Sequence, residues 1–112
     1  MTDKEMLKNL HTALDDKMGV DIKMLDISKI SSLGEYFILV SGNNENHLKA
    51  LADAAGEVLH KAGFKIRHSE GYNSSNWILL DFSFVIVHIF DKEARDFYNL
   101  ERIWTDAELV RV

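Results

Sequence analysis

Residues 77–104, WILLDFSFVIVHIFDKEARDFYNLERIW, decide the fold of this chain. They predict two apolar strands, Trp77–Asp81 and Val85–Phe90, joined by three residues, which is short enough for a hairpin. Asp91 can cap the helix that follows. The apolar side of that helix is expected to hold Ala94, Phe97 and Tyr98, and the pattern continues through Leu100, Ile103 and Trp104.

The residues before this stretch predict five more elements. Thr2 and Glu5 form a capping box in front of a helical apolar stripe, and Gly19 follows as a stop signal. The expected elements are a helix over residues 3–18, strands over 22–27 and 36–41, a helix from the Asn44 cap to Gly63, and a strand over 64–70. That last strand is reached from the second through a helix, so these two strands should run parallel with a right-handed crossover.

The whole pattern, α-β-β-α-β-β-β-α, indicates an α/β fold of the α+β type. The 112 residues are expected to form one domain, residues 1–112, with too little apolar periodicity after Asp106 to predict structure there. Apolar residues at 46% and charged residues at 28% are typical of a globular protein. No apolar run approaches the roughly 20 residues that cross a bilayer, and no signal peptide is recognisable, so we expect a cytoplasmic protein.

Composition also narrows the chemistry. The chain has no cysteine, which excludes a disulfide framework, thiolate zinc sites and cysteine nucleophiles. Its formal net charge is −5 and its 13 basic residues are scattered, whereas proteins that grip nucleic acid by its phosphates cluster Lys and Arg. Little direct contact with nucleic acid is therefore expected, and a basic protein partner is favoured.

The predicted hairpin has two different faces, because side chains alternate along a strand. One face is purely apolar and should pack on the helices; it holds Ile78, Leu80, Val85, Val87 and Ile89. The other face mixes large apolar groups with two polar ones; it holds Trp77, Leu79, Asp81, Ile86, His88 and Phe90. Asp81 and His88 could form an acid–base dyad, half of a metal site, or the polar part of a partner-binding surface.

The first two alternatives lack support in the sequence. A catalytic dyad needs a nucleophile or a third orienting group, and no residue is nominated for that role. A metal site is conceivable from His68, Glu70, Asp81 and His88, but no ligand spacing favours it. Partner surfaces are rich in Trp, Tyr and Arg, which Trp77, Tyr98 and Arg95 supply, although Trp77 and Tyr98 could also simply complete the core.

The same stretch closely resembles the signature of the ribosomal silencing factor family, also called Iojap-like proteins. That signature is a W-[IV]-[LV]-[LV]-D strand, a V-[IV]-V-H strand and then R-x-[FL]-Y-x-L-E-x-[LI]-W. The resemblance runs from about Asp21 to Ala107. It includes Ser31-Ser32, Tyr36-Phe37, Gly42, Ala52-Asp53 and Glu70-Gly71. One departure is Asn44-Glu45-Asn46, where relatives usually have Ser-x-Arg.

The resemblance implies a mixed five-stranded sheet flanked by helices, similar to nucleotidyltransferases but without their activity. The Gly-Ser opening and paired Asp of such enzymes have no match around Gly42-Asn43-Asn44, so neither catalysis, a metal nor a cofactor is expected. Family members bind ribosomal protein fourteen of the large subunit, block joining of the small subunit and repress translation; organellar relatives assist large-subunit assembly, and homodimers are common off the ribosome. The expected partner-binding residues are Trp77, Leu79, Asp81, His88, Arg95 and Tyr98. Asp81 and His88 are expected either to orient this face or to form a purely internal hydrogen bond with each other.

Overall fold

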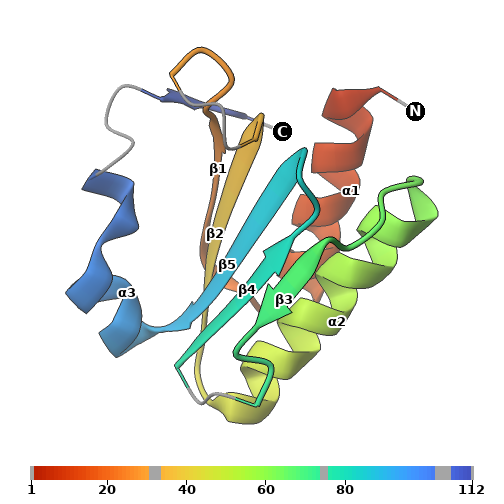
Figure 1. Ribbon diagram of the computed structural model, residues 1–112. Helices are drawn as coiled ribbons and strands as arrows, with labels where there is room; N and C mark the ends of the chain where they lie inside the picture. Colours follow the sequence, from red (N-terminus) through yellow and green to blue (C-terminus); the bar gives the residue numbers. More distant parts are fainter. Residues whose placement is uncertain (1, 31–33, 74–75, 103–106, 112) are drawn as a thin grey trace.

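A mixed sheet lies between two helices on one side and one helix on the other (Figure 1). The structure is a computed structural model that describes residues 2–30, 34–73, 76–102 and 107–111. The elements in chain order are α1 (Asp3–Asp16), β1 (Val20–Asp26), β2 (Tyr36–Gly42), α2 (Glu45–Lys61), β3 (His68–Glu70), β4 (Trp77–Asp81), β5 (Val85–Asp91), α3 (Lys92–Tyr98), a 3₁₀ turn (Leu100–Arg102) and β6 (Glu108–Leu109). The predicted order of the first eight elements is confirmed.

The sheet order is β3-β4-β5-β2-β1-β6. Only β2 and β5 are parallel neighbours, and they pair along their full length, from Tyr36 opposite Val85 to Gly42 opposite Asp91. The other pairings are antiparallel, so the mixed sheet and the β4–β5 hairpin are confirmed. The prediction of five strands is wrong by one, because β6 adds to β1 as a short exposed strand that apolar periodicity does not reveal.

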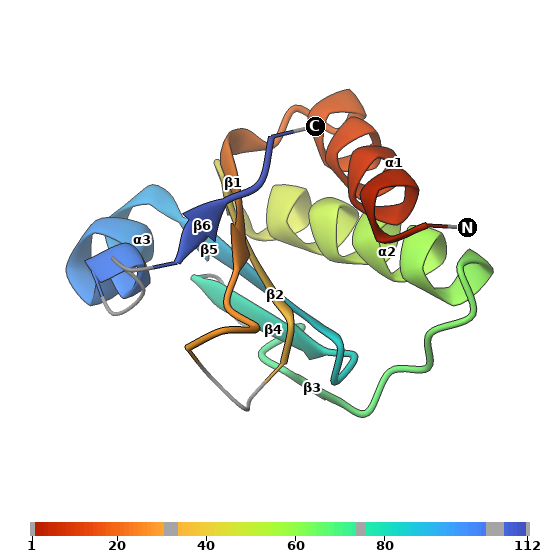
Figure 2. The ribbon, with the colours of Figure 1, turned by 90° about the horizontal axis from the view of Figure 1, so that it is seen from above.

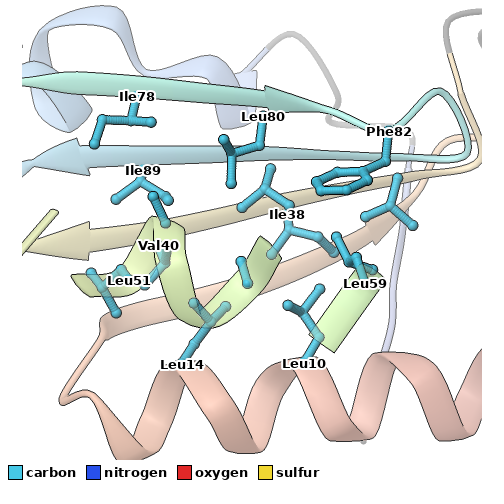
Figure 3. Packing of buried hydrophobic residues seen from close by; sticks show 14 of the residues in the cluster. Leu10, Leu14, Ile38, Val40, Leu51, Leu59, Ile78, Leu80, Phe82 and Ile89 are labelled. Atoms are coloured by element: carbon cyan, nitrogen blue, oxygen red, sulfur yellow. The ribbon is translucent and has the colours of Figure 1, made fainter. Parts of the chain in front are cut away.

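The main core lies between the sheet and helices α1 and α2. Both views place these two helices side by side on one face of the sheet and α3 on the other (Figures 1 and 2). In Figure 3, Leu10 and Leu14 of α1 and Leu51 and Leu59 of α2 point toward the strands. The predicted apolar face of the hairpin is confirmed, since all five of its residues are buried in this core: Ile78, Leu80, Val85, Val87 and Ile89.

The helix starts follow the predicted caps. Thr2 accepts from the Glu5 N–H, Asn44 accepts from the His47 N–H, and Asp91 accepts from the Ala94 N–H. Asn44 therefore caps α2 as predicted. No helix in the described part of the chain is long and apolar enough to cross a membrane.

The third predicted strand is much shorter than residues 64–70. Only His68–Glu70 pair with a neighbour, and that neighbour is β4 at the edge of the sheet. The pairings make β3 run in the same direction as β2, as predicted, but β4 and β5 lie between them. The start of the predicted strand is lost where Phe64, half-buried, packs against the edge of the core and stacks on Phe84 with ring centroids 5.5 Å apart.

The predicted apolar side of the last helix is right for Ala94 but wrong for Phe97 and Tyr98. Ala94 and Arg95 are the buried residues of α3, whereas Phe97 is 82% exposed and Tyr98 46% exposed. The Asp91 cap fixes the phase of the helix, and Arg95 reaches polar partners on the sheet, so Phe97 points to solvent. Ile103 and Trp104, predicted to continue the pattern, and Ser31-Ser32 of the family signature lie outside the described residues.

Two glycines give a matched test of this packing. A Cβ on Gly19, in the turn after α1, would lie 2.8 Å from Val40 Cγ2 and 2.9 Å from the Leu14 carbonyl oxygen, whereas a Cβ on Gly56, inside α2, would meet nothing within 4 Å. We expect Gly19→Ala to lower the unfolding free energy by about 1–3 kcal/mol through overpacking. We expect Gly56→Ala to raise it by about 0.5–1 kcal/mol through helix propensity. Urea denaturation measures both, and equal effects would contradict the packing described.

Candidate partner-binding site

The second face of the hairpin carries a cluster of aromatic rings that reaches from the core to the surface. Trp77 of β4 lies opposite Phe90 of β5, and their ring centroids are 5.1 Å apart. The Tyr98 ring of α3 packs against Trp77 at 4.7 Å, and Phe97 meets Tyr98 edge-on at 5.1 Å. Phe90 is buried and Trp77 is half-buried, so the cluster becomes progressively more exposed toward α3.

His88 lies on the buried side of this cluster and contacts its rings. Its side chain is 7% exposed and lies between Phe37 and Phe90, with ring centroids at 4.4 and 5.8 Å. The Trp77 indole N–H donates to His88 Nδ1 over 3.0 Å. Because an indole nitrogen only donates, Nδ1 carries no proton and the proton of the neutral ring is assigned to Nε2. Burial lowers the pKa of His88 to about 4, which keeps the ring neutral near pH 7.

Arg95 is an internal residue. Its side chain is 6% exposed; Nη1 donates to Ser41 Oγ over 3.0 Å, and Nη2 lies 3.4 Å from Asp21 Oδ2. A weaker contact of 3.5 Å joins Nη1 to the Val20 carbonyl oxygen. These partners stand at the ends of β1 and β2, so Arg95 ties α3 to the sheet and thereby positions Tyr98.

The other predicted site residues lie on the surface or close to it. Leu79 and Asp81 are half-buried on β4, and Tyr98 is exposed. Asp81 Oδ1 accepts from the Ser83 N–H over 2.7 Å in the hairpin turn, and Asp81 pairs with Ile86 rather than with His88. The structure therefore brings Trp77, Leu79, His88 and Tyr98 together and gives Asp81 a role in the turn.

Two hollows open beside this cluster and share Asn76. The first, which we call the β4 hollow, has a volume of about 340 Å³ and is lined by Glu70, Gly71, Asn76, Trp77 and Leu79. The second, the α3 hollow, has a volume of about 300 Å³ and is lined by Asn76, Glu93, Ala94, Phe97 and Tyr98. Gly71 is required here, because its φ is +77° and a Cβ would collide with the Trp77 carbonyl oxygen.

Phe97 is the site residue that the sequence prediction misplaced. The sequence predicts it on the apolar side of the helix with Ala94 and Tyr98, but it is 82% exposed, and Arg95 occupies the inward side instead. We call Trp77, Leu79, Phe97 and Tyr98 together the docking surface.

The catalytic and metal alternatives find little support in this geometry. His68 Nε2 lies 3.0 Å from Glu70 Oε1 at the exposed edge of the sheet, while His88 is buried and its Nδ1 accepts from Trp77. Asp81 bonds to the turn instead of to His88. Among the residues that the structure describes, no three His, Asp or Glu side chains form a group that could hold a metal ion.

The fold of this chain matches that of a protein with a known crystal structure. A crystal structure of a protein from Chromobacterium violaceum matches with a TM-score of 0.87 and 38% sequence identity, covering 94% of this chain and 88% of that one. This is a small α+β protein with a mixed sheet flanked by helices. The family model described as "Ribosomal silencing factor during starvation" matches residues 1–112. The chain belongs to the ribosomal silencing factor family.

Individual relatives agree with this assignment. Proteins named ribosomal silencing factor from Halalkalibacterium halodurans and Bacillus subtilis are 35% and 37% identical to it, over 100% and 97% of this chain and 96% and 92% of their own lengths. A mouse protein, named for mitochondrial assembly of the ribosomal large subunit, is 27% identical over 92% of this chain but only 45% of its own length.

The buried imidazole predicts a specific acid sensitivity. In the unfolded chain His88 takes up a proton as the pH falls below about 6.5, but in the folded protein only near pH 4. The unfolded state binds more protons between these values, so the unfolding free energy should fall by up to about 3 kcal/mol as the pH drops through this window. His88→Asn, which stays neutral and keeps an acceptor for Trp77, should lose less.

Urea titrations of both proteins at several pH values between 6.5 and 4 measure this difference. The carboxyl groups are the same in both proteins, so their contribution to the pH dependence of the unfolding free energy cancels in the comparison. One of them is Asp26, whose pKa is lowered by hydrogen bonds from the Ser28 hydroxyl and N–H. Equal acid sensitivity of the two proteins would show that His88 is not the group responsible.

Proposed function

We propose that this protein is a ribosomal silencing factor that acts by occupying a surface rather than by catalysis. It binds ribosomal protein fourteen of the large subunit in the cytoplasm and sterically blocks joining of the small subunit, which represses translation. The proposal includes homodimers away from the ribosome, as the family resemblance implies. The single observation that carries it is the docking surface, with half-buried Trp77 and Leu79 and exposed Phe97 and Tyr98, on a chain of the silencing-factor family.

The docking surface has the properties of an interface hot spot. Aromatic anchors that project from a rigid support lose little conformational freedom on binding, and such residues dominate interface energies. Trp77 is fixed from below by His88 and from the side by Tyr98, and Arg95 fixes the helix that carries Tyr98. We assign direct contact to Trp77, Leu79 and Tyr98. Of the remaining predicted residues, His88 and Arg95 position them, and Asp81 holds the hairpin turn.

The charge of the chain supports a protein partner. The net charge is −5, and ribosomal proteins are mostly basic, so opposite charges would speed and orient the encounter. Blocking the interface between two subunits requires no catalysis. It requires only that the protein binds with sufficient affinity at a position where it overlaps the other subunit.

Truncation of the aromatic anchors tests the surface. We expect Trp77→Ala and Tyr98→Ala each to weaken binding to the large subunit by at least about 2 kcal/mol, the scale of a hot spot. Tyr72→Ala is the matched control, because Tyr72 is 40% exposed, close to the 46% of Tyr98, but bonds to Asp53 of α2, the helix on the other face of the sheet. Binding is measured by titration of labelled protein with purified large subunits. Wild-type affinity in both folded variants would move the site elsewhere.

Sedimentation through a sucrose gradient tests the mechanism. The purified protein, mixed with isolated large and small subunits, is expected to migrate with the large subunit and to deplete the joined particle. Migration with the large subunit without any effect on joining would replace silencing by an assembly role. Absence from both subunit fractions would leave only a shared fold and would reopen the Asp81–His88 face as a candidate active site.

The second candidate function is assembly of the large subunit through the same surface. The observation that favours it is the relationship to the mouse protein, whose name describes mitochondrial large-subunit assembly. Both functions need the docking surface, so the variants at Trp77 and Tyr98 affect both, and only the effect on subunit joining separates them.

A further inference from the structure

The two hollows beside Asn76 combine an aromatic wall with a carboxylate. The β4 hollow joins Trp77 to Glu70, and the α3 hollow joins Phe97 and Tyr98 to Glu93. Glu70 lies 3.0 Å from His68. The Glu93 carboxylate, by contrast, forms no hydrogen bond or ion pair within residues 2–30, 34–73, 76–102 and 107–111. The α3 hollow therefore presents a carboxylate that is available to a partner.

Packing within the fold does not explain the position of Phe97. It is 82% exposed, the highest value among the exposed large apolar residues of the described chain, and its ring meets the Tyr98 ring at 87°. An exposed aromatic pair of this kind offers ring faces to a ligand. Rings next to a carboxylate suit a side chain that is apolar along its stem and cationic at its end.

We propose that the α3 hollow binds an arginine or lysine side chain of the protein partner. The aliphatic stem lies against the Phe97 and Tyr98 rings, and the charged end reaches the Glu93 carboxylate. This deepens the proposed function and rests on it, because the partner is the ribosomal surface that the silencing factor covers. It adds Phe97 and Glu93 to the binding residues and assigns the chemistry of the group that they recognise.

The charges of this region favour a cation over an anion. Glu93 lines the α3 hollow, Glu70 lines the neighbouring one, and the whole chain carries −5. A phosphate of ribosomal RNA would be repelled by these carboxylates, since nucleic-acid contacts rely on Lys and Arg. A purely apolar side chain would gain from the rings but nothing from Glu93.

The test compares four proteins for binding to purified large subunits: wild type, Phe97→Ala, Glu93→Lys and Asp96→Lys. Asp96 is an exposed carboxylate of the same helix that lines neither hollow, so it controls for the general effect of charge reversal on α3. We expect Glu93→Lys and Phe97→Ala each to raise the Kd at least about tenfold, and Asp96→Lys to change it less than about threefold. Thermal unfolding verifies that each variant is folded.

Salt dependence supplies a second readout. Glu93→Gln should reduce the slope of log Kd against log salt concentration, because one charge pair is lost from the complex. Equal losses for Glu93→Lys and Asp96→Lys would overturn the inference in favour of diffuse electrostatics. Tighter binding by Glu93→Lys would overturn it in favour of an RNA phosphate. Wild-type affinity in both hollow variants would overturn it while leaving the proposed function intact, whereas failure of the wild-type protein to bind would overturn both.

Discussion

The parallel pairing of β2 with β5 is the constraint on which the rest of the structure depends. These two strands pair over seven residues each and stand at the centre of the sheet. A central parallel pair must be covered on both faces, and α1 and α2 cover one face completely. The seven residues of α3 cover only part of the other, which leaves the rings of β4 and α3 at the surface. Trp77 and Leu79, the strand residues of the docking surface, lie where this face of the sheet is only half-buried.

His88 connects this core to that surface. A leucine in its place would fill the space between Phe37 and Phe90 but could not accept from the Trp77 indole. The buried imidazole therefore makes one hydrogen bond within the described residues, and its partner is Trp77, the residue that we expect to bind most strongly. Arg95 turns inward instead, and its contacts with Ser41 and Asp21 of the sheet fix the helix that carries Tyr98. In the proposed function, these contacts would serve both stability and recognition.

Patterns along the chain were sufficient for most of the fold and for the faces of the hairpin, because alternation and capping are local effects. The family signature identified the family, and the proposed function rests on that membership. Local patterns failed where a long-range contact decides the outcome: Phe64 leaves its strand to stack on Phe84, and Arg95 turns inward to reach Ser41. The second failure concealed the exposure of Phe97, because composition alone suggests that a phenylalanine is buried and an arginine exposed.

The two edges of the sheet have a consequence for the behaviour of the protein in a crowded cell. β3 has only three residues, all exposed, with His68 and Glu70 at its ends, and β6 has two. Such short edge strands give an incoming chain few backbone groups to pair with and resist edge-to-edge aggregation. A protein with exposed aromatic rings on α3 can therefore accumulate without polymerising through the edges of its sheet.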